Sequence, residues 1–461
     1  MHYDFLIVGN GSIGTYSALN LKKKFPNKTV GIIGDLQREG SASVAAGAMA
    51  NVYAEVESCC KSHHELEEKY LSVGLRGRQQ WKEFFRMTKT QNVVTCEDTI
   101  VFLKKGYSEF EQKNFESCTS AALRDNVGKK LTQLEINSLF PHTNIKIDSA
   151  TKLLGEFSIC TTGLFKCLDS FCENEQIAFI NQNAIEIDPQ KMSVRTADNI
   201  YTASKIVVAA GSQSSALFKD MKIVPMLQGV GTALLIQKKE TELNFLSKHV
   251  YRSVNRGGAQ CGLHSVPRSD GSTYVGAGNY ITKPSKSGHR FETIRYLLNA
   301  FSDELATDEI GYRLVGDLCH GYRPRSLDGQ PIIGCLNSNE NIFLASGTNR
   351  VGLTWAPDIS NQIVKWASEK DISSEYSGWS PCRVPDSLMT EEESLEYFCS
   401  SRYAAALEHS LFDINNQSQV QSRHEEIERS AKLLIQNIKN KSDWNLNSIH
   451  PDNWNAITND D

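Results

Sequence analysis

A glycine-rich turn close to the first residue constrains this chain more than any other feature. Residues 3–8 (Tyr-Asp-Phe-Leu-Ile-Val) read as a short buried strand, and residues 15–21 have helical character. Between them stands Gly9-Asn10-Gly11-Ser12-Ile13-Gly14, a GxGxxG pattern. A strand, a turn of this kind and a helix predict an α/β unit that holds the pyrophosphate of a dinucleotide. The alternative is a strand–turn–helix without a ligand.

Each position of the turn has a physical reason. Gly9 permits the tight turn, Gly11 lets the backbone approach a phosphate, and Gly14 lets the helix pack close to the strand. The N–H groups at the start of the helix, at Ser12 and Ile13, are free to bind phosphate oxygens. Asp35 follows a second strand at residues 29–33, at the spacing of a carboxylate that accepts a ribose hydroxyl. The turn alone does not separate NAD from FAD.

A run of small residues follows Asp35, at positions 40–49 (Gly-Ser-Ala-Ser-Val-Ala-Ala-Gly-Ala-Met). One interpretation is a flexible loop or a helix start with Ser43 as its cap. The other is close approach of the backbone to a flat ring system, which small residues permit. In that case Ser41, Ser43, Ala46 and Gly47 contact a cofactor.

Further along, the strand and helix pattern continues in a fixed order. A helix begins near Leu164, and short strands follow at residues 178–180, 184–188, 193–196 and 205–208, the last ending in Ala209-Ala210-Gly211. Residues 264–267 and 273–277 read as two strands joined by a turn. Residues 321–334 (Gly-Tyr-Arg-Pro-Arg-Ser-Leu-Asp-Gly-Gln-Pro-Ile-Ile-Gly) precede a strand at 341–347, and Gly352 opens a further helix.

In these motifs and their order the chain resembles the D-amino-acid oxidase superfamily of FAD enzymes, especially its glycine oxidase and sarcosine oxidase branch. The resemblance covers about residues 1–372. It implies an α/β fold in which an FAD-binding Rossmann-type domain is interleaved with a substrate domain built on an antiparallel sheet. The FAD domain would comprise residues 1–80, 145–217 and 315–372, and the substrate domain residues 81–144 and 218–314.

The resemblance also implies where FAD binds, without a covalent link. Ala184 would contact the adenine, and Ala210 and Gly211 would end a strand near the cofactor. The segment Arg350, Val351, Gly352, Leu353 and Thr354 would open a helix that points its N-terminus at the flavin pyrimidine ring and stabilises negative charge there. The cysteine that links FAD in sarcosine oxidases falls at Gly321, two residues from Cys319.

A substrate site follows from the same resemblance. Arg323 and Arg350 would fix a substrate carboxylate, because a guanidinium offers two parallel hydrogen bonds. His264 falls at a substrate position of the family, and Ala48, Asn279 and Tyr322 would line the same pocket. His264 and Asn279 make this pocket more polar than that of glycine oxidase, which favours a substrate with a second polar group. The alternatives are structural roles for the histidine and the arginines.

The activity implied is oxidation of the C–N bond of an amino acid or N-substituted glycine. A hydride passes to the flavin, and the resulting imine is hydrolysed; oxygen or another acceptor reoxidises the flavin. Two alternatives stay open: removal of a carboxymethyl group from a modified transfer-RNA base, and a non-catalytic flavoprotein subunit. The net charge of −5 disfavours a nucleic-acid partner.

The remaining expectations concern location, metals and the last part of the chain. No apolar run is long enough for a membrane span, no secretion signal is recognisable, and no CxxC pair or other metal motif occurs, so a cytoplasmic protein with reduced thiols is expected. Residues 373–461 lie outside the resemblance and predict a C-terminal helical extension, with helices starting after Thr390 and near Val420. These helices would form a hairpin on the main body, a contact between copies in a homo-oligomer, or a lid.

Overall fold

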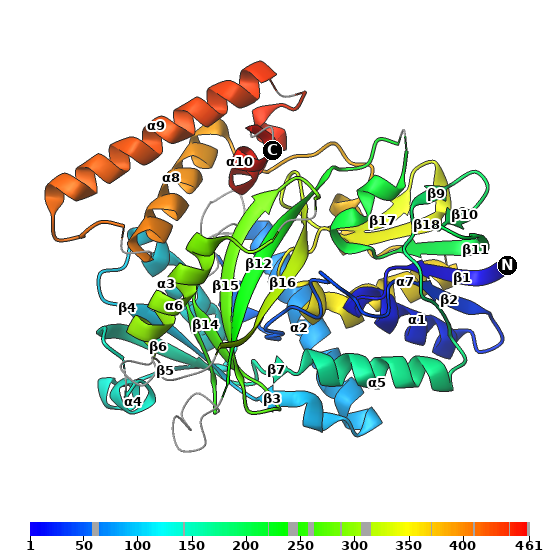
Figure 1. Ribbon diagram of the computed structural model, residues 1–461, viewed down its shortest axis with the longest axis horizontal. Helices are drawn as coiled ribbons and strands as arrows, with labels where there is room; N and C mark the ends of the chain where they lie inside the picture. Colours follow the sequence, from blue (N-terminus) through cyan, green and yellow to red (C-terminus); the bar gives the residue numbers. More distant parts are fainter. Residues whose placement is uncertain are drawn as a thin grey trace.

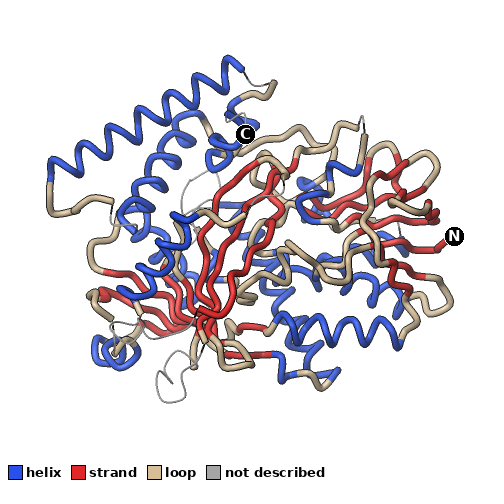
Figure 2. The backbone as a smooth tube through the Cα atoms, viewed as in Figure 1, coloured by secondary structure: helices blue, strands red, loops and turns tan. Residues whose placement is uncertain are grey.

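The computed structural model describes residues 1–57, 64–141, 143–219, 221–237, 248–256, 262–285, 288–305, 315–369, 371–408, 411–441 and 443–458. Two large sheets lie side by side along the long axis of the molecule, with helices packed around both (Figures 1 and 2). The C-terminal extension lies outside both sheets, at the top of the view in Figure 1.

The first sheet has the order β17-β18-β11-β1-β2-β8, parallel from β18 to β8 and antiparallel at β17, with β10 and β9 continuing from β11 in antiparallel pairing. Its strands are β1 (His2–Val8), β2 (Val30–Ile33), β8 (Ala178–Ile180), β9 (Glu186–Asp188), β10 (Ser193–Arg195), β11 (Ile200–Val208), β17 (Ile332–Leu336) and β18 (Asn339–Ser346). Strand β1 pairs in parallel with both β2 and β11. Its apolar run is buried because both faces of the sheet are covered.

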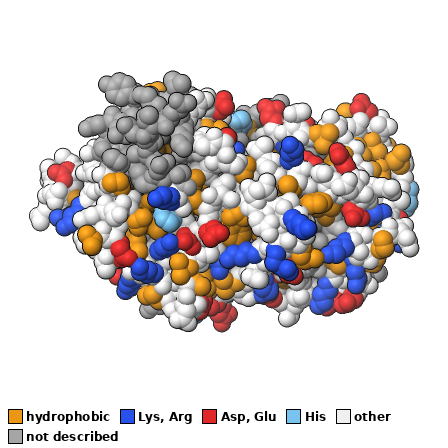
Figure 3. Space-filling model, turned by 90° about the horizontal axis from the view of Figure 1, so that it is seen from below, with side chains coloured by type: hydrophobic (Ala, Val, Ile, Leu, Met, Phe, Trp, Pro, Cys, Tyr) orange, Lys and Arg blue, Asp and Glu red, His pale blue; other side chains and the backbone are white. Residues whose placement is uncertain are grey.

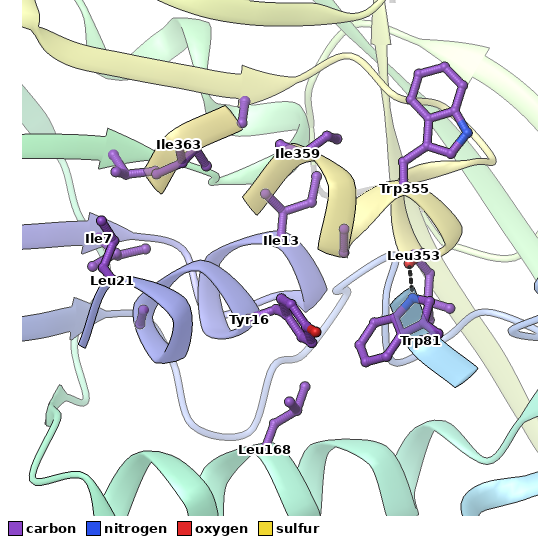
Figure 4. Close-up of a cluster of buried hydrophobic side chains, with 14 of the residues drawn as sticks. Ile7, Ile13, Tyr16, Leu21, Trp81, Leu168, Leu353, Trp355, Ile359 and Ile363 are labelled. Carbon is purple, nitrogen blue, oxygen red and sulfur yellow. Dashed lines mark hydrogen bonds between the residues drawn. The ribbon is translucent and has the colours of Figure 1, made fainter. Parts of the chain in front are cut away.

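The two faces of β1 belong to different hydrophobic cores, as the alternation of side chains along a strand requires. Phe5 and Ile7 pack with helices, whereas Leu6 and Val8 pack on the opposite face. The covering helices are α1 (Ser12–Lys24), α2 (His64–Thr88), α5 (Thr161–Asn174) and α7 (Gly352–Glu369). Figure 4 shows this helical core, where side chains from β1, α1, α2, α5 and α7 meet.

The second sheet has the order β16-β12-β15-β14-β13-β4-β6-β5 and is antiparallel except where β13 pairs with β4. Its strands are β4 (Thr99–Lys104), β5 (Gly128–Lys130), β6 (Ile147–Leu153), β12 (Met226–Ile236), β13 (Val250–Ser253), β14 (His264–Pro267), β15 (Thr273–Thr282) and β16 (Val315–Ser326). Helices α3 (Glu109–Arg124), α4 (Gln133–Leu139) and α6 (Phe291–Glu304) accompany it, and β3 (Val94–Cys96) pairs with β7 (Ser158–Ile159) separately.

The architecture confirms the predicted α/β fold with a second, antiparallel sheet. The domain boundaries stay a prediction. In the structure, strands from the sequence ranges predicted for the two domains pair within one sheet. Strands β6 and β16 lie in stretches assigned from the sequence to the FAD domain, yet both pair within the second sheet. Strand β16 therefore runs from the second sheet directly into the loop that leads to β17 of the first.

The C-terminal extension forms the two predicted helices, α8 (Glu391–Glu408) and α9 (Gln417–Lys441), and a short helix that was not predicted, α10 (Trp454–Thr458). Thr390 caps α8, since its hydroxyl accepts the Glu393 N–H at 3.2 Å and the Glu393 carboxylate accepts the Thr390 N–H at 3.0 Å. Phe398 and Trp454 pack on Leu327, in the loop after β16. Within one chain the extension is thus a packed helical cover on the main body.

Two further observations bear on the sequence-based expectations. Among the described residues, no helix combines the length and apolar character that crossing a membrane requires. The nine cysteines in the described part of the chain are all free thiols.

Candidate active site

The glycine turn after β1 leaves no room for side chains. Gly9 has φ +108°, and a Cβ there would lie 2.3 Å from the carbonyl oxygen of Ala209. A Cβ on Gly14 would lie 1.9 Å from the carbonyl oxygen of Gly9. Helix α1 can therefore begin directly against the turn. Gly11 is its N-cap residue and has no side chain, and the Ser12 N–H, which the sequence predicts to be free, donates to the Ser43 hydroxyl at 3.2 Å.

The acidic residue after β2 lies at the same cavity as the turn. Asp35 is held beside it because its carbonyl oxygen accepts the Asn10 side-chain amide at 2.7 Å. Arg38, which the sequence did not single out, also lines the cavity; its Nε donates to the Asn10 carbonyl and its guanidinium pairs with Asp169. These contacts fix the loop that follows β2.

The small-residue run at 40–49 lies between the two sheets. Ser41 forms a bridge with Tyr322 of β16, and Met49 forms one with Ser158 of β7. The hydroxyl of Tyr274 on β15 donates to the Ala45 carbonyl at 2.9 Å. A Cβ on Gly47 would lie 3.0 Å from the Tyr274 ring. The run is thus an ordered strap along the cavity, neither a free loop nor a helix start.

The strand ends of the first sheet complete one side of the cavity. The Ser346 hydroxyl at the end of β18 donates to the Gly211 carbonyl at 2.7 Å. Helix α7 begins at Gly352, where a Cβ would lie 2.5 Å from the Thr348 hydroxyl. The Trp81 indole N–H donates to the Leu353 carbonyl at 2.8 Å, which fixes the first turn of α7 against α2 (Figure 4).

Five strands of the second sheet, β12 to β16, contribute to the opposite wall. Arg323 on β16 lies opposite Gly229 of β12, and a Cβ on the next same-face residue, Gly231, would lie 2.8 Å from its Nη2. The absence of a side chain at Gly231 therefore makes room for the guanidinium. Asn279 lies on β15, which pairs with β12, and its Oδ1 is 3.0 Å from the position that a Cβ on Gly229 would take.

His264 lies next to this arginine and is electrically neutral near pH 7. Burial, together with the positive charges of Arg252 and Arg323, lowers its pKa to about 3. Its ring stacks on Tyr274 with centroids 5.9 Å apart. Its Nδ1 lies 3.2 Å from the Gly262 carbonyl, which only accepts, so the proton belongs on Nδ1 and Nε2 is an acceptor.

Arg350 is part of a buried charge cluster. Its Nε lies 3.1 Å from Glu55, and its Nη2 lies 2.6 Å from Glu57. Arg252 on β13 pairs with the other oxygen of Glu55 at 2.7 Å and with Asn51. Burial alone would raise the pKa of Glu55, but the two guanidiniums outweigh it and hold the pKa at about 2. Glu55 is therefore ionised, and each arginine is anchored to it.

A single cavity of about 510 Å³ joins these parts, from the glycine turn to Arg323. The sequence matches the family described as FAD dependent oxidoreductase (DAO) over residues 4–366. The chain belongs to the FAD dependent oxidoreductase family. The predicted relationship to the D-amino-acid oxidase enzymes is thereby confirmed.

Relatives of known activity are distant in sequence. Monomeric sarcosine oxidase of Bacillus sp. (strain B-0618) is 23% identical over 241 residues, which are 50% of this chain and 57% of that protein. Glycine oxidase of Pseudomonas putida is 28% identical over 169 residues, 36% of this chain and 41% of that protein. The matched stretches thus span less than two thirds of each relative.

Solved structures share the fold over most of the chain. Glycine oxidase from Geobacillus kaustophilus superposes with a TM-score of 0.70 at 17% identity, covering 83% of this chain and 99% of that one. Iminodiacetate oxidase from Chelativorans sp. BNC1 gives 0.68 at 15% identity, covering 82% and 98%. L-alpha-glycerophosphate oxidase from Mycoplasma pneumoniae, solved with FAD bound, gives 0.65 at 17% identity, covering 83% and 98%.

FAD is the cofactor of this DAO family member, as predicted, and the residues at the cavity fit it. The first turn of α1 carries no acidic side chain that would repel a pyrophosphate. A Cβ on Gly211 would meet no atom within 4 Å, so the cavity is open there. The short side chains of the strap leave the backbone accessible to a flat ring.

Most of the predicted site residues line this cavity. They are Gly9, Gly11, Ser12, Ile13, Asp35, Ser41, Ser43, Ala46, Gly47, Ala48, Ala184, Ala210, Gly211, His264, Tyr322, Arg323, Arg350, Gly352 and Leu353. Four predicted residues do not line it: Gly14, Asn279, Val351 and Thr354. Gly14 instead makes the close helix–strand contact that the turn motif predicts.

Several residues that line the active-site cavity belong to no sequence pattern that predicts a functional site. None of Arg252, Glu55 and Asn255 belongs to a spacing that predicts a site. Gly231 and Tyr274 stand in ordinary strand patterns. A glycine inside a strand, such as Gly231, indicates close approach of another group. This is the sequence signal that could have located the side of the cavity that Arg323 lines.

Proposed function

We propose that this DAO family member oxidises the C–N bond of an amino acid or an N-substituted glycine. FAD, when bound, supplies the chemistry by accepting a hydride from the substrate carbon next to the nitrogen. The chain's own residues hold the substrate in position for that transfer, and the imine formed is then hydrolysed by water.

The observation that carries the proposal is the guanidinium of Arg323 over Gly231, in the cavity and beside a neutral histidine. A guanidinium binds a carboxylate through two parallel hydrogen bonds. His264 adds no second positive charge beside Arg323, and Gly231 leaves room next to the guanidinium. We expect Nε2 of His264 to accept a hydrogen bond from a donor on the substrate, such as its amine.

We assign the carboxylate to Arg323 because Arg350 already neutralises Glu55 and Glu57. A substrate carboxylate at Arg350 would have to compete with two anionic side chains. In this proposal Arg350 keeps the wall of the cavity in place, whereas Arg323 makes the direct contact with the carboxylate.

The names of the relatives agree with this substrate class. Sarcosine and glycine are a secondary and a primary amine that each carry a carboxylate, and iminodiacetate carries two. We also expect FAD to be held without a covalent bond, because no described cysteine lines the cavity. A Cβ at Gly321 would lie 2.7 Å from that of Ala45, so a cysteine would not fit there unchanged.

The proposal is tested by flavin bleaching without oxygen. The FAD-loaded protein is mixed anaerobically with amino acids, N-alkyl glycines and the same amines without a carboxylate. We expect amines that carry a carboxylate to reduce the flavin faster than the matched amines without one, and at least a tenfold slower reduction by the former at low substrate concentration in Arg323→Gln. Arg124→Gln, at an exposed arginine, serves as the matched control. If no amine with a carboxylate bleaches the flavin, the assignment of Arg323 fails.

The same assay, repeated with modified transfer RNA added, decides the two alternatives. A flavin that no amine reduces would favour a non-catalytic subunit, and reduction that requires modified transfer RNA would favour the RNA-modifying activity. On the face shown in Figure 3, Lys and Arg side chains lie among acidic and hydrophobic ones, so this face offers no uniformly basic surface for nucleic acid.

A further inference from the structure

A second, smaller cavity of about 130 Å³ adjoins the active-site cavity. The two share four lining residues, Glu55, Thr348, Asn349 and Arg350, so these residues form a common wall. The remaining walls come from α2, from the loop after β16 and from the C-terminal extension.

The C-terminal extension supplies part of the wall of this second cavity. That part lies outside the residues that match the family. Ser387, Tyr397, His450 and Asp452 line it, whereas the family match ends at residue 366. Helix α10 packs on β15 of the second sheet, and α8 packs on α3 and α9 (Figure 1). Any role of this cavity is thus tied to the feature in which the chain departs from its matched family.

The charged side chains of the described residues that line the cavity are each paired with an opposite charge, with one exception; Glu55 pairs with Arg252 as well as with Arg350. The pairs lie 2.6 to 3.1 Å apart and are Arg325 with Asp452, Arg350 with Glu55 and Glu57, and Asp328 with Arg383. The exception is Glu67 on α2, whose Oε1 is buried and has no hydrogen-bond partner among the described residues. A buried carboxyl oxygen without a partner is costly unless a ligand pairs with it.

The surroundings of Glu67 favour a cation as that ligand. Burial, with the nearby negative charges of Glu57 and Glu68, raises the pKa of Glu67 to about 8. The other charged or titratable side chains that line the cavity are Tyr70 on α2, Arg325 and Asp328 after β16, Glu55 and Arg350 in the shared wall, and Tyr397, His450 and Asp452 in the extension. The arginines among them are engaged by the anions named above.

Aromatic side chains line the cavity as well: Tyr70, Trp355 and Tyr397. Aromatic surfaces and a carboxylate together suit an alkylammonium ion, since the alkyl part is buried against the rings and the charge is neutralised. The volume admits a short chain of a few carbons.

We propose that this cavity binds the ammonium group of a small organic amine, with the Glu67 carboxylate as its counter-ion. On binding at neutral pH, Glu67 releases its proton to the solvent and the ammonium takes its place. The ammonium belongs either to a free amine or to the distal end of a substrate that extends past Arg350.

The first arm of the test is calorimetry with n-butylammonium chloride and the FAD-loaded protein, in two buffers of different ionisation enthalpy at pH 7. We expect binding with release of about one proton, and tighter binding as the pH rises from 6 to 8. Glu67→Gln should weaken binding at least tenfold and abolish the proton release. Glu65→Gln, at an exposed glutamate of the same helix, should change neither.

The second arm separates the two sources of the ammonium and rests on the proposed oxidation. Anaerobic flavin reduction by lysine is compared with that by norleucine, which has the same carbon chain but no distal ammonium. If the ammonium is the distal group of a substrate, flavin reduction by lysine, but not by norleucine, should be at least tenfold slower in Glu67→Gln. If the ammonium belongs to a free amine, neither rate should change. If neither amino acid reduces the flavin, calorimetry alone decides. The proposal is overturned if neither n-butylammonium binding nor the preference for lysine depends on Glu67.

Discussion

Replacing Gly231 with alanine should damage substrate binding while leaving the fold intact. The added Cβ would lie 2.8 Å from Nη2 and 3.1 Å from Cζ of Arg323. An ordinary contact is about 0.6 Å longer than the shorter of these distances, so one group must move. The guanidinium is the flexible end of a long side chain and moves at little cost, whereas the strand is held on both sides by β15 and β16.

The magnitude follows from the hydrogen bonds at stake. A displaced guanidinium loses one well-aligned, charge-assisted hydrogen bond to the substrate carboxylate, worth about 1.5–3 kcal/mol. Since 1.4 kcal/mol corresponds to about a factor of ten, kcat/KM should fall roughly ten- to hundredfold. The unfolding temperature should stay within a few degrees of the wild type, because Gly231 does not have a positive φ.

The assay is stopped-flow flavin reduction with an accepted amino acid and with the corresponding amine that lacks the carboxylate. Gly288→Ala is the matched control, since a Cβ there meets no atom within 4 Å. The double variant Gly231→Ala/Arg323→Gln should be no slower than Arg323→Gln alone, because both changes remove the same contact. Wild-type rates in Gly231→Ala, or equal losses for both amines, would refute the placement of the carboxylate at Arg323.

Three further outcomes are expected. Gly9→Ala should yield protein without bound flavin, visible as loss of the flavin absorbance at purification, because Gly9 has φ +108° and no room for a Cβ. Asp452→Ala removes the buried partner of Arg325 and should lower the free energy of unfolding in urea by about 3 kcal/mol, whereas Lys439→Ala, at an exposed pair, should change it by less than about 0.5 kcal/mol. The pKa of His264 is lower in the folded than in the unfolded protein, so its contribution to stability is present above pH 6.5 and is lost as the pH falls toward 3. His264→Gln should therefore reduce the slope of the unfolding free energy against pH, between pH 6 and 4, by the equivalent of about one proton. An unchanged slope would contradict a neutral buried imidazole.

Local sequence patterns determined the elements and the cofactor side of the site. The glycines at 9, 11 and 14 serve a turn whose geometry is settled within six residues, so the strand, the turn and α1 could be predicted together. The capping pattern at Thr390 and Glu393 likewise located the start of α8. The family resemblance added the order of the later strands and the identity of FAD.

The tertiary structure alone decided the charge cluster and the exact wall of the substrate site. Alternation along a strand predicts which face a side chain occupies, but not which distant strand lies opposite; the pairing of Arg252 with His264 and of Arg323 with Gly229 depends on sheet order and register. The partner of Arg350 is Glu55, 295 positions earlier in the chain, so a residue that the sequence assigns to the substrate is also part of an internal ion pair. Likewise, the C-terminal helices were evident from periodicity, but only packing shows that they close a second cavity against Arg350 and Glu67. Such contacts arise between segments that approach only after folding, and no spacing in the sequence records them.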